Sequence, residues 1–191
     1  MVGRGRFLRA GERGTTMIEV LVTLVIIAFG LLGMVGLQAR LQVSEVESYQ
    51  RSQALLLASD MANRIAANRN NAASYVTGTS SPMGGSTACP TTSSTSTIAE
   101  VDLSEWCESL RGAGEISNGA RVASLIGGRG CVQVVGGDYF ISVAWQGLAP
   151  FAAPPTSVAC GLDAYNGASG SSCVNDRCRR AVTTLVRIAA L

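Results

Sequence analysis

The sequence contains no histidine and no lysine, so all of its basic side chains are arginine. Several kinds of chemistry are thereby excluded, because a lysine Schiff base, a P-loop lysine and a histidine general base each need a side chain that the chain lacks. A zinc site with histidine ligands is excluded for the same reason. An enzyme built on this sequence would depend on serine, cysteine or carboxylate groups alone, and the sequence predicts no cofactor.

Charged residues are also few, at 15% of the chain, whereas about a quarter is usual for globular proteins. Residues 1–14 contain four arginines and one glutamate, a net charge of +3. Since the whole chain carries +2, residues 15–191 carry −1. A basic surface of the kind that binds nucleic acid is therefore not expected. We expect neither nucleic acid nor a small-molecule substrate among the partners.

The six cysteines all lie in the part of the chain that follows residue 88. They are Cys89, Cys107, Cys131, Cys160, Cys173 and Cys178. An even number on one side of a long apolar run indicates an oxidising compartment and disulfide bonds. The alternative is a metal cluster, which is disfavoured because no C-x-x-C pair accompanies Cys173 and Cys178.

The longest apolar run covers residues 17–37, and Glu19 is its only charged residue. At about 1.5 Å per residue, a helix of this length measures about 30 Å, which is enough to cross a hydrocarbon core. Because arginine-rich segments stay on the cytoplasmic side, we expect residues 1–14 there and the rest of the chain outside.

Two common explanations of such a run are a cleaved secretory signal and an uncleaved signal anchor. A secretory signal has an apolar core of about 7–15 residues and a small-x-small cleavage site. This run is longer, and it continues through Gln38, Ala39 and Arg40 without such a site. A signal anchor fits the composition but gives no reason for Glu19. A carboxylate in an apolar span costs free energy, although the helix dipole offsets up to about 1 kcal/mol near an N-terminus.

The residues around Glu19 form a more specific pattern. Gly14 is followed by Thr15, Thr16, Met17, Ile18 and Glu19. A basic leader, a glycine, this run and a long apolar helix together resemble the type IV prepilins, with Thr15 in place of their usual phenylalanine. The resemblance implies that a prepilin peptidase cuts between Gly14 and Thr15, and that the new amino group of Thr15 is methylated. It also implies that the Glu19 carboxylate pairs with the freed amine of a neighbouring subunit during assembly.

Residues 15–68 contain no proline and are rich in helix formers, which predicts one continuous helix. Beyond residue 37, side chains spaced by three or four residues predict a face that packs against a globular head. This face comprises Val43, Val46, Gln50, Ala54, Leu57, Met61 and Ile65. Arg40, Glu47, Arg51 and Arg64 lie largely off it. The spacing of Glu47 and Arg51 predicts an i,i+4 ion pair.

Three glycines, Gly30, Gly33 and Gly36, recur within the apolar run. They are typical of close helix–helix packing. A second interpretation is local unwinding of the helix, since each glycine costs about 1 kcal/mol of helix propensity.

The first part of the head combines a loop and a short helix. Residues 77–99 are rich in Ser, Thr, Gly and Pro and predict a surface loop that Cys89 tethers. Asp102 and Glu105 have the spacing of a capping box at the start of a helix. Leu103, Trp106, Cys107 and Leu110 share one face of this helix. We interpret Trp106 as a core side chain rather than a sugar-stacking platform.

Strands are predicted next, at residues 120–126, 131–135, 139–146 and 181–188. Gly136 and Gly137 predict a hairpin turn between the second and third of these. In the third, Tyr139, Ile141, Val143 and Trp145 alternate onto one face. The sequence therefore predicts an α+β roll, in which the long helix lies on an antiparallel sheet of three or four strands.

Residues 139–147 and 178–188, with a cysteine-containing loop between them, resemble the V-type minor pilins, also called type IV pilus modification proteins. The resemblance implies a disulfide-bounded C-terminal loop and a place in a minor-pilin complex that primes pilus assembly, on which twitching motility and attachment depend. Six cysteines allow fifteen pairings, which the sequence does not resolve. We favour Cys89–Cys107, Cys173–Cys178 and, as the remainder, Cys131–Cys160.

The resulting organisation has four parts. Residues 1–14 are the leader, 15–37 the transmembrane half of the helix, 38–68 its amphipathic half and 69–191 the periplasmic or extracellular head. The expected partners are the prepilin peptidase, other minor pilins, the major pilin and the inner membrane. Before assembly the chain would cross the inner membrane once, and after assembly it would lie in the pilus.

Three other functions would share parts of this pattern. A minor pseudopilin of a type II secretion system would share the leader, the helix and the roll. A membrane-anchored periplasmic enzyme is disfavoured, because Asp138, Asp163 and Asp176 all lie in turn or loop contexts where aspartate is common. An anchored binding module that never polymerises would leave Glu19 without a purpose.

Overall fold

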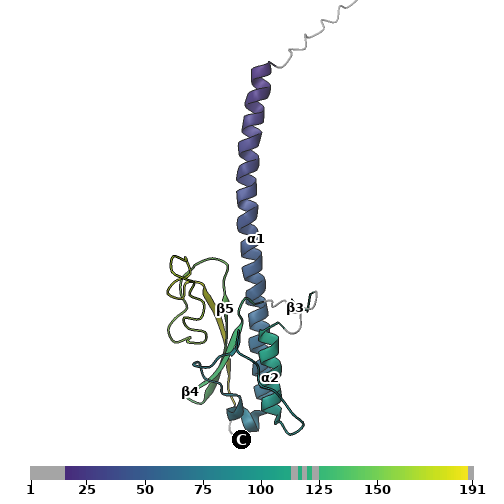
Figure 1. The fold of residues 1–191 in the computed structure, drawn as a ribbon, viewed down its shortest axis with the longest axis vertical. Coiled ribbons are helices and arrows are strands. Elements are labelled where there is room, and N and C mark those ends of the chain that lie inside the picture. Colours follow the sequence, from purple (N-terminus) through teal and green to yellow (C-terminus); the bar gives the residue numbers. More distant parts are fainter. Residues whose placement is uncertain (1–15, 113–115, 118–119, 122–124, 189–191) are drawn as a thin grey trace, which may run out of the picture. The chain divides into compact units, whose positions relative to one another are not determined.

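The computed structural model describes residues 16–112, 116–117, 120–121 and 125–188. Its elements are α1 (Met17–Ala67), the 3₁₀ segment η1 (Arg69–Tyr75), β1 (Met83–Gly84), α2 (Ile98–Leu110), β2 (Ile116–Ser117), β3 (Ala120–Arg121), β4 (Arg129–Val135), β5 (Asp138–Gln146) and β6 (Arg179–Val186) (Figure 1). The chain divides into two compact units, residues 1–42 and 43–191. Each is described by itself below.

The described part of the first unit consists of the beginning of α1. Every residue from 16 to 42 is exposed. The helix is long and apolar enough to cross a membrane, judged by length and composition. Gly30, Gly33 and Gly36 are all helical, and nothing lies within 4 Å of the position that a Cβ atom would take at each. The predicted helix is thus confirmed from Met17 to Ala67, and local unwinding at the glycines stays a prediction.

In the second unit, the remainder of α1 buries one face in the head. The buried residues are Gln50, Ala54, Ala58, Met61, Ala62 and Ile65. The prediction was wrong at Val43 and Val46, which are exposed. The face is wider than predicted farther along, because α2 also packs on α1 and Trp106 Nε1 donates a hydrogen bond to the Leu57 carbonyl oxygen (2.9 Å).

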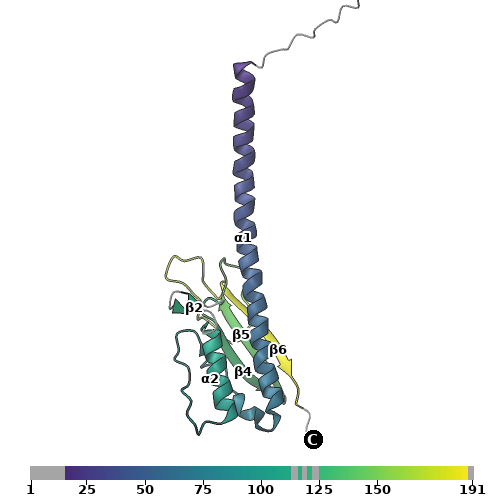
Figure 2. The same cartoon turned by 90° about the vertical axis from the view of Figure 1, so that its right-hand side faces the viewer.

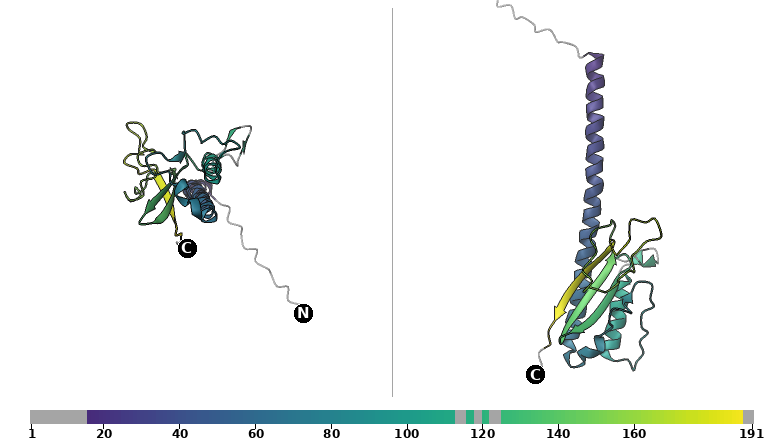
Figure 3. Two further views of the ribbon diagram at one scale, coloured as in Figure 1. Left: turned by 90° about the horizontal axis from the view of Figure 1, so that it is seen from below. Right: turned by 90° about the vertical axis from the view of Figure 1, so that its left-hand side faces the viewer.

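Four strands form an antiparallel sheet in the order β1-β4-β5-β6. β4 and β5 make the predicted hairpin, in which Val135 pairs with Asp138 and both Gly136 (φ 63°) and Gly137 (φ 90°) adopt left-handed backbone. α1 and α2 lie on one face of this sheet, while the chain after β5 crosses the other face (Figures 2 and 3). The predicted strands 131–135, 139–146 and 181–188 are confirmed to within two residues.

The predicted strand over residues 120–126 is present at Ala120–Arg121 (β3), which pairs with β2 in a separate two-stranded ribbon. Residues 122–124 lie outside the described residues, and the prediction was wrong at residues 125 and 126. Leu125 and Ile126 lie in a bend and a turn that lead into Gly127, which has a φ of 61°. Leu125 is nevertheless buried in the core. An apolar residue that is buried from a turn therefore gives the same sequence pattern as a strand residue.

Helix α2 begins earlier than predicted. Thr97 is its N-cap, and the Thr97 hydroxyl and the Glu100 carboxylate cap each other's backbone N–H groups. These hydrogen bonds from Thr97 lower the pKa of Glu100 below its usual value. The predicted capping residues Asp102 and Glu105 lie inside the helix and bind Arg64 instead.

The predicted role of Trp106 as a core side chain is confirmed. It is fully buried and lies over β4, where a Cβ atom at Gly130 would come within 2.2 Å of its ring. Glycine at this position lets α2 approach the sheet closely.

Candidate functional site

The first candidate is the start of α1. The Thr16 carbonyl oxygen accepts hydrogen bonds from the N–H groups of Glu19 (3.0 Å) and Val20 (3.3 Å), so Glu19 lies in the first helical turn. The positive end of the helix dipole favours a carboxylate at this place. Gly14 and Thr15, the predicted cleavage and methylation positions, lie outside the described residues.

The large apolar side chains along the rest of this segment are exposed. Phe29 and Leu32, for example, are 70% and 68% exposed. A surface of this kind is unfavourable in water at about 25 cal/mol per Å² of apolar area. It therefore requires lipid or other apolar helices around it.

Three disulfides staple the head, and they join Cys89 to Cys107, Cys131 to Cys160, and Cys173 to Cys178. These are the three pairs favoured from the sequence. The first fixes the loop before α2, the second attaches the chain after β5 to β4, and the third closes a short loop before β6. All six cysteines are described and all are paired, and no cluster of metal-ligating side chains occurs among the described residues.

A buried ion pair holds the loop between β5 and β6. Arg179 Nε lies 3.0 Å from Asp176 Oδ2, and the two side chains are 1% and 7% exposed. The guanidinium also donates to the carbonyl oxygens of Val158 and Cys160. The other Asp176 oxygen accepts from the N–H of Asp163 (2.8 Å). One salt bridge thus organises three separate stretches of the loop, a role that the aspartate's turn context in the sequence does not reveal.

Tyr165 fixes the same loop to the outer face of the sheet. Its hydroxyl lies 2.9 Å from the Gly127 carbonyl oxygen and 3.0 Å from that of Ala144. Burial raises the pKa of Tyr165, although the nearby Arg129 opposes this rise. The loop covers Ser142 and Ala144, so β5 is buried on both faces at its centre, whereas the sequence predicted burial of one face.

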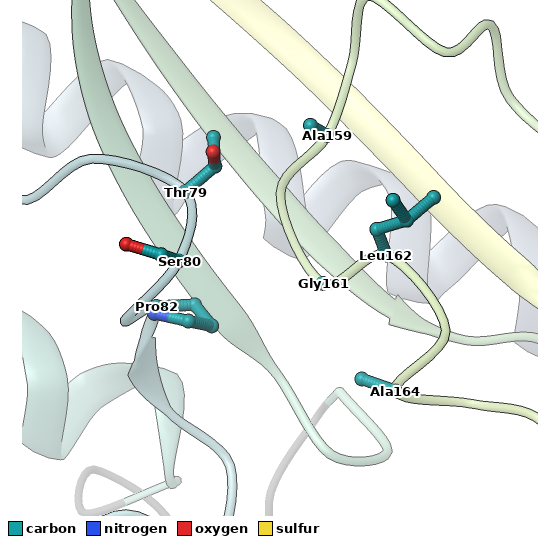
Figure 4. Close-up of a pocket in the computed structure, with 7 residues that line it drawn as sticks. All are labelled: Thr79, Ser80, Pro82, Ala159, Gly161, Leu162 and Ala164. Atoms are coloured by element: carbon teal, nitrogen blue, oxygen red, sulfur yellow. The ribbon is translucent and has the colours of Figure 1, made fainter.

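An open cavity of about 410 Å³ lies between this loop and the chain before β1 (Figure 4). Thr79, Ser80 and Pro82 line it from one side, and Ala159, Gly161, Leu162 and Ala164 from the other. None of these described lining residues is charged.

A family of proteins described as Tt1218-like, type IV pilin Tt1218, matches residues 36–104 of this chain. The matched stretch runs from α1 through η1 and β1 into α2. This match covers 69 of the 191 residues and supports the identification of the chain as a type IV pilin. No curated protein and no solved structure matches it.

Members of this family are structural proteins rather than enzymes, and they assemble with other pilins as subunits of a pilus. The long apolar helix, the small antiparallel sheet and the disulfides of the head agree with this assignment. The single apolar helix fits a membrane-anchored pilin.

Arg64 is a structural centre of the pilin head that the sequence did not reveal. It contacts Asp60 (3.0 Å), Asp102 (2.8 Å) and Glu105 (2.8 Å), and so joins α1 to α2. Partial burial lowers the pKa of Arg64, but its hydrogen bonds to Glu105 and Asp102 outweigh this and raise the pKa overall. The Tyr75 hydroxyl donates to Asp102 and adds η1 to the network.

Glu47 also has a different partner from the predicted Arg51. Its carboxylate lies 3.1 Å from Arg180 Nη2 and accepts a hydrogen bond from the N–H of Leu148 (3.2 Å). The contact joins α1 to the start of β6, and these residues are too far apart in the sequence for spacing to predict it.

The buried Asp176–Arg179 pair gives a stability prediction. Asp176→Asn removes one charge and leaves Arg179 buried without its counter-ion, so it should lower the free energy of unfolding by about 3 kcal/mol. Asparagine tolerates the left-handed backbone at this position (φ 58°), so the change tests the charge rather than the backbone. Urea unfolding of the detergent-solubilised chain, followed by tryptophan fluorescence, measures the loss.

The matched control is Asp138→Asn, because Asp138 pairs with Arg187 at the surface, where the two side chains are 29% and 76% exposed. The control should cost less than about 1 kcal/mol. Equal losses in the two variants would contradict the organising role of the buried pair.

Proposed function

We propose that this pilin is a minor pilin of a type IV pilus, which takes part in priming pilus assembly and so supports twitching motility and attachment. The observation that carries the proposal is Glu19, a lone carboxylate in the first turn of an exposed apolar helix. The basic leader that ends in Gly14 adds the processing signal. The six-cysteine head and the V-type pattern of residues 139–147 and 178–188 favour a minor subunit.

Before assembly, the subunit is a precursor in the inner membrane. Residues 1–14 hold the N-terminus in the cytoplasm by their positive charge. Residues 15–37 cross the membrane, residues 38–68 continue as the amphipathic half of the helix, and residues 69–191 form the head in the periplasm. The prepilin peptidase cuts after Gly14, and the new amine of Thr15 becomes the methylation site.

During assembly, the apolar half of α1 leaves the lipid and packs among the helices of other pilins. Glu19 then has no water to solvate its carboxylate. The freed amine of Thr15 on a neighbouring subunit supplies the opposite charge, and each group satisfies the other in apolar surroundings. The neighbours are the major pilin and other minor pilins.

The second candidate is a minor pseudopilin of a type II secretion system, because the leader and the helix serve both assemblies. The description of the matched family as a type IV pilin favours the pilus. A pseudopilin would require the same processing, so cleavage alone does not separate the two functions.

Processing at Gly14 is the first test of the proposal. Intact-mass analysis of the protein from its native host should find a chain that starts at Thr15, with or without one added methyl group. Gly14→Ala should block the cut and leave the leader attached, because the peptidase needs glycine at this position. Gly11→Ala, a change to the other glycine near the end of the leader, is the control and should be cut normally. A native chain that starts at Met1 or near Arg40 would sink the proposal.

The second test separates the pilus from the secretion system. Deletion of the gene should remove most surface pili, counted by electron microscopy, while secretion of exoproteins continues at the wild-type level. Complementation with the native sequence should restore the pili. Normal pili together with lost secretion would establish the pseudopilin instead.

A further inference from the structure

One group of apolar side chains on the head is exposed although the segment that carries it is firmly held. Val43 and Val46 on α1 are 41% and 44% exposed, and Leu148 and Phe151, just after β5, are 45% and 70% exposed. We call these four residues the apolar rim. Val43 precedes Glu47 by one helical turn, so it lies next to the Glu47 contact with Leu148.

The position of Phe151 is fixed by a set of polar contacts around Arg180. Arg180 Nη2 bonds to Glu47 Oε1 (3.1 Å) and to the Ala149 carbonyl oxygen (2.8 Å). Its guanidinium lies 5.7 Å from the centre of the Phe151 ring. The Phe151 N–H donates to the Arg177 carbonyl oxygen (2.7 Å). These contacts therefore hold the Phe151 ring in its exposed position.

Arg177 adds a positive charge beside the apolar rim, whereas Arg180 and Glu47 form a neutral pair. Arg177 is exposed and its main chain is bonded to Phe151, while Arg180 lies between Phe151 and Glu47. Glu47 is already paired with Arg180. The exposed Glu45 is two residues away from Glu47, about 200° around the helix, and so lies on another side.

The chain between the apolar span and the rim is short. Residues 38–42 separate residue 37, the last of the span, from Val43, and a helix of this length rises only about 8 Å. The headgroup layer on each side of the hydrocarbon core is about 5–8 Å thick. The length of the chain alone therefore keeps Val43 close to the headgroup layer of an anchored subunit.

We propose that the apolar rim rests in the headgroup layer of the membrane in the unassembled pilin, with Arg177 beside lipid phosphates. Apolar and aromatic side chains combined with arginine are the composition that binds this layer, through buried apolar area and attraction to anionic lipid. The inference rests on the proposed membrane-anchored precursor. It adds that the head contacts the bilayer surface before assembly and leaves that surface when the subunit enters the pilus.

The test uses the full chain in phosphatidylcholine vesicles that contain lipid spin-labelled at the headgroup, with and without phosphatidylglycerol. The variant F151W places an indole in the rim. The native Trp106 and Trp145, which are 0% and 3% exposed, contribute the background fluorescence. The added fluorescence of F151W should be quenched by the labelled lipid. L148W, at a second position in the rim, should behave alike.

The control is V135W, because Val135 is also an exposed valine, at 61%, but lies at the other end of the sheet. It pairs with the first residue of β5, whereas Leu148 follows the last, and these ends are about 27 Å apart along the strand. The fluorescence added by V135W should be unaffected by the labelled lipid. Arg177→Gln should reduce the additional quenching of F151W that phosphatidylglycerol produces.

Flotation with the vesicles, measured on the same samples, tests membrane anchoring of the chain independently of the contact between the rim and the headgroup layer. A chain that floats but shows no quenching of F151W and L148W would overturn the seating of the head while leaving the anchored precursor intact. A chain that does not float would refute the anchored precursor and the seating together. A third outcome is that labelled lipid quenches F151W no more than V135W, and that iodide is excluded from position 151 only in assembled pili. This outcome would identify the rim as a contact between subunits and overturn the lipid assignment.

Discussion

The environment of α1 constrains everything else in this pilin. Residues 16–42 are exposed throughout, and residues 17–37 among them are apolar apart from a few polar side chains, whereas from Gln50 onward one face of the helix is buried in the head. The exposed part is stable only in lipid or among other apolar helices. The membrane and a pilus are two such environments, and under the proposed function Glu19 is the residue that distinguishes them.

The head has a different constraint, which is how a small domain with little regular structure stays folded. Its sheet has three strands of useful length, and much of the chain after β5 is irregular. Three disulfides, the buried Asp176–Arg179 pair and Tyr165 hold this irregular chain against the sheet. Disulfides compensate for a limited core in this way in many small extracytoplasmic domains. The cavity beside this chain is lined by described residues that carry no charge.

Local signals were enough to predict α1, the Gly136–Gly137 hairpin and strands β4, β5 and β6, because periodicity and turn residues are encoded over short stretches. Two of the errors depended on partners distant in the sequence, whereas the missed cap of Thr97 and Glu100 is local. Leu125 looked like part of a strand because it is buried from a turn. Glu47 binds Arg180 across the fold rather than Arg51 along the helix. Glu19 and the cysteines could be singled out in advance, whereas Arg64 and Asp176 gained meaning only from their contacts.

The most direct measurement of the central claim is incorporation of Glu19→Ala into sheared pili, quantified against the major pilin. Processing of the variant and its three disulfides should be normal, but its amount in pili should fall at least about tenfold if the lost pairing is worth more than about 1.4 kcal/mol in the filament. Glu45→Ala, an exposed acid on the same helix, should be incorporated like the native chain. Normal incorporation of Glu19→Ala would contradict the account, because the lone carboxylate of the apolar helix would then have no part in assembly.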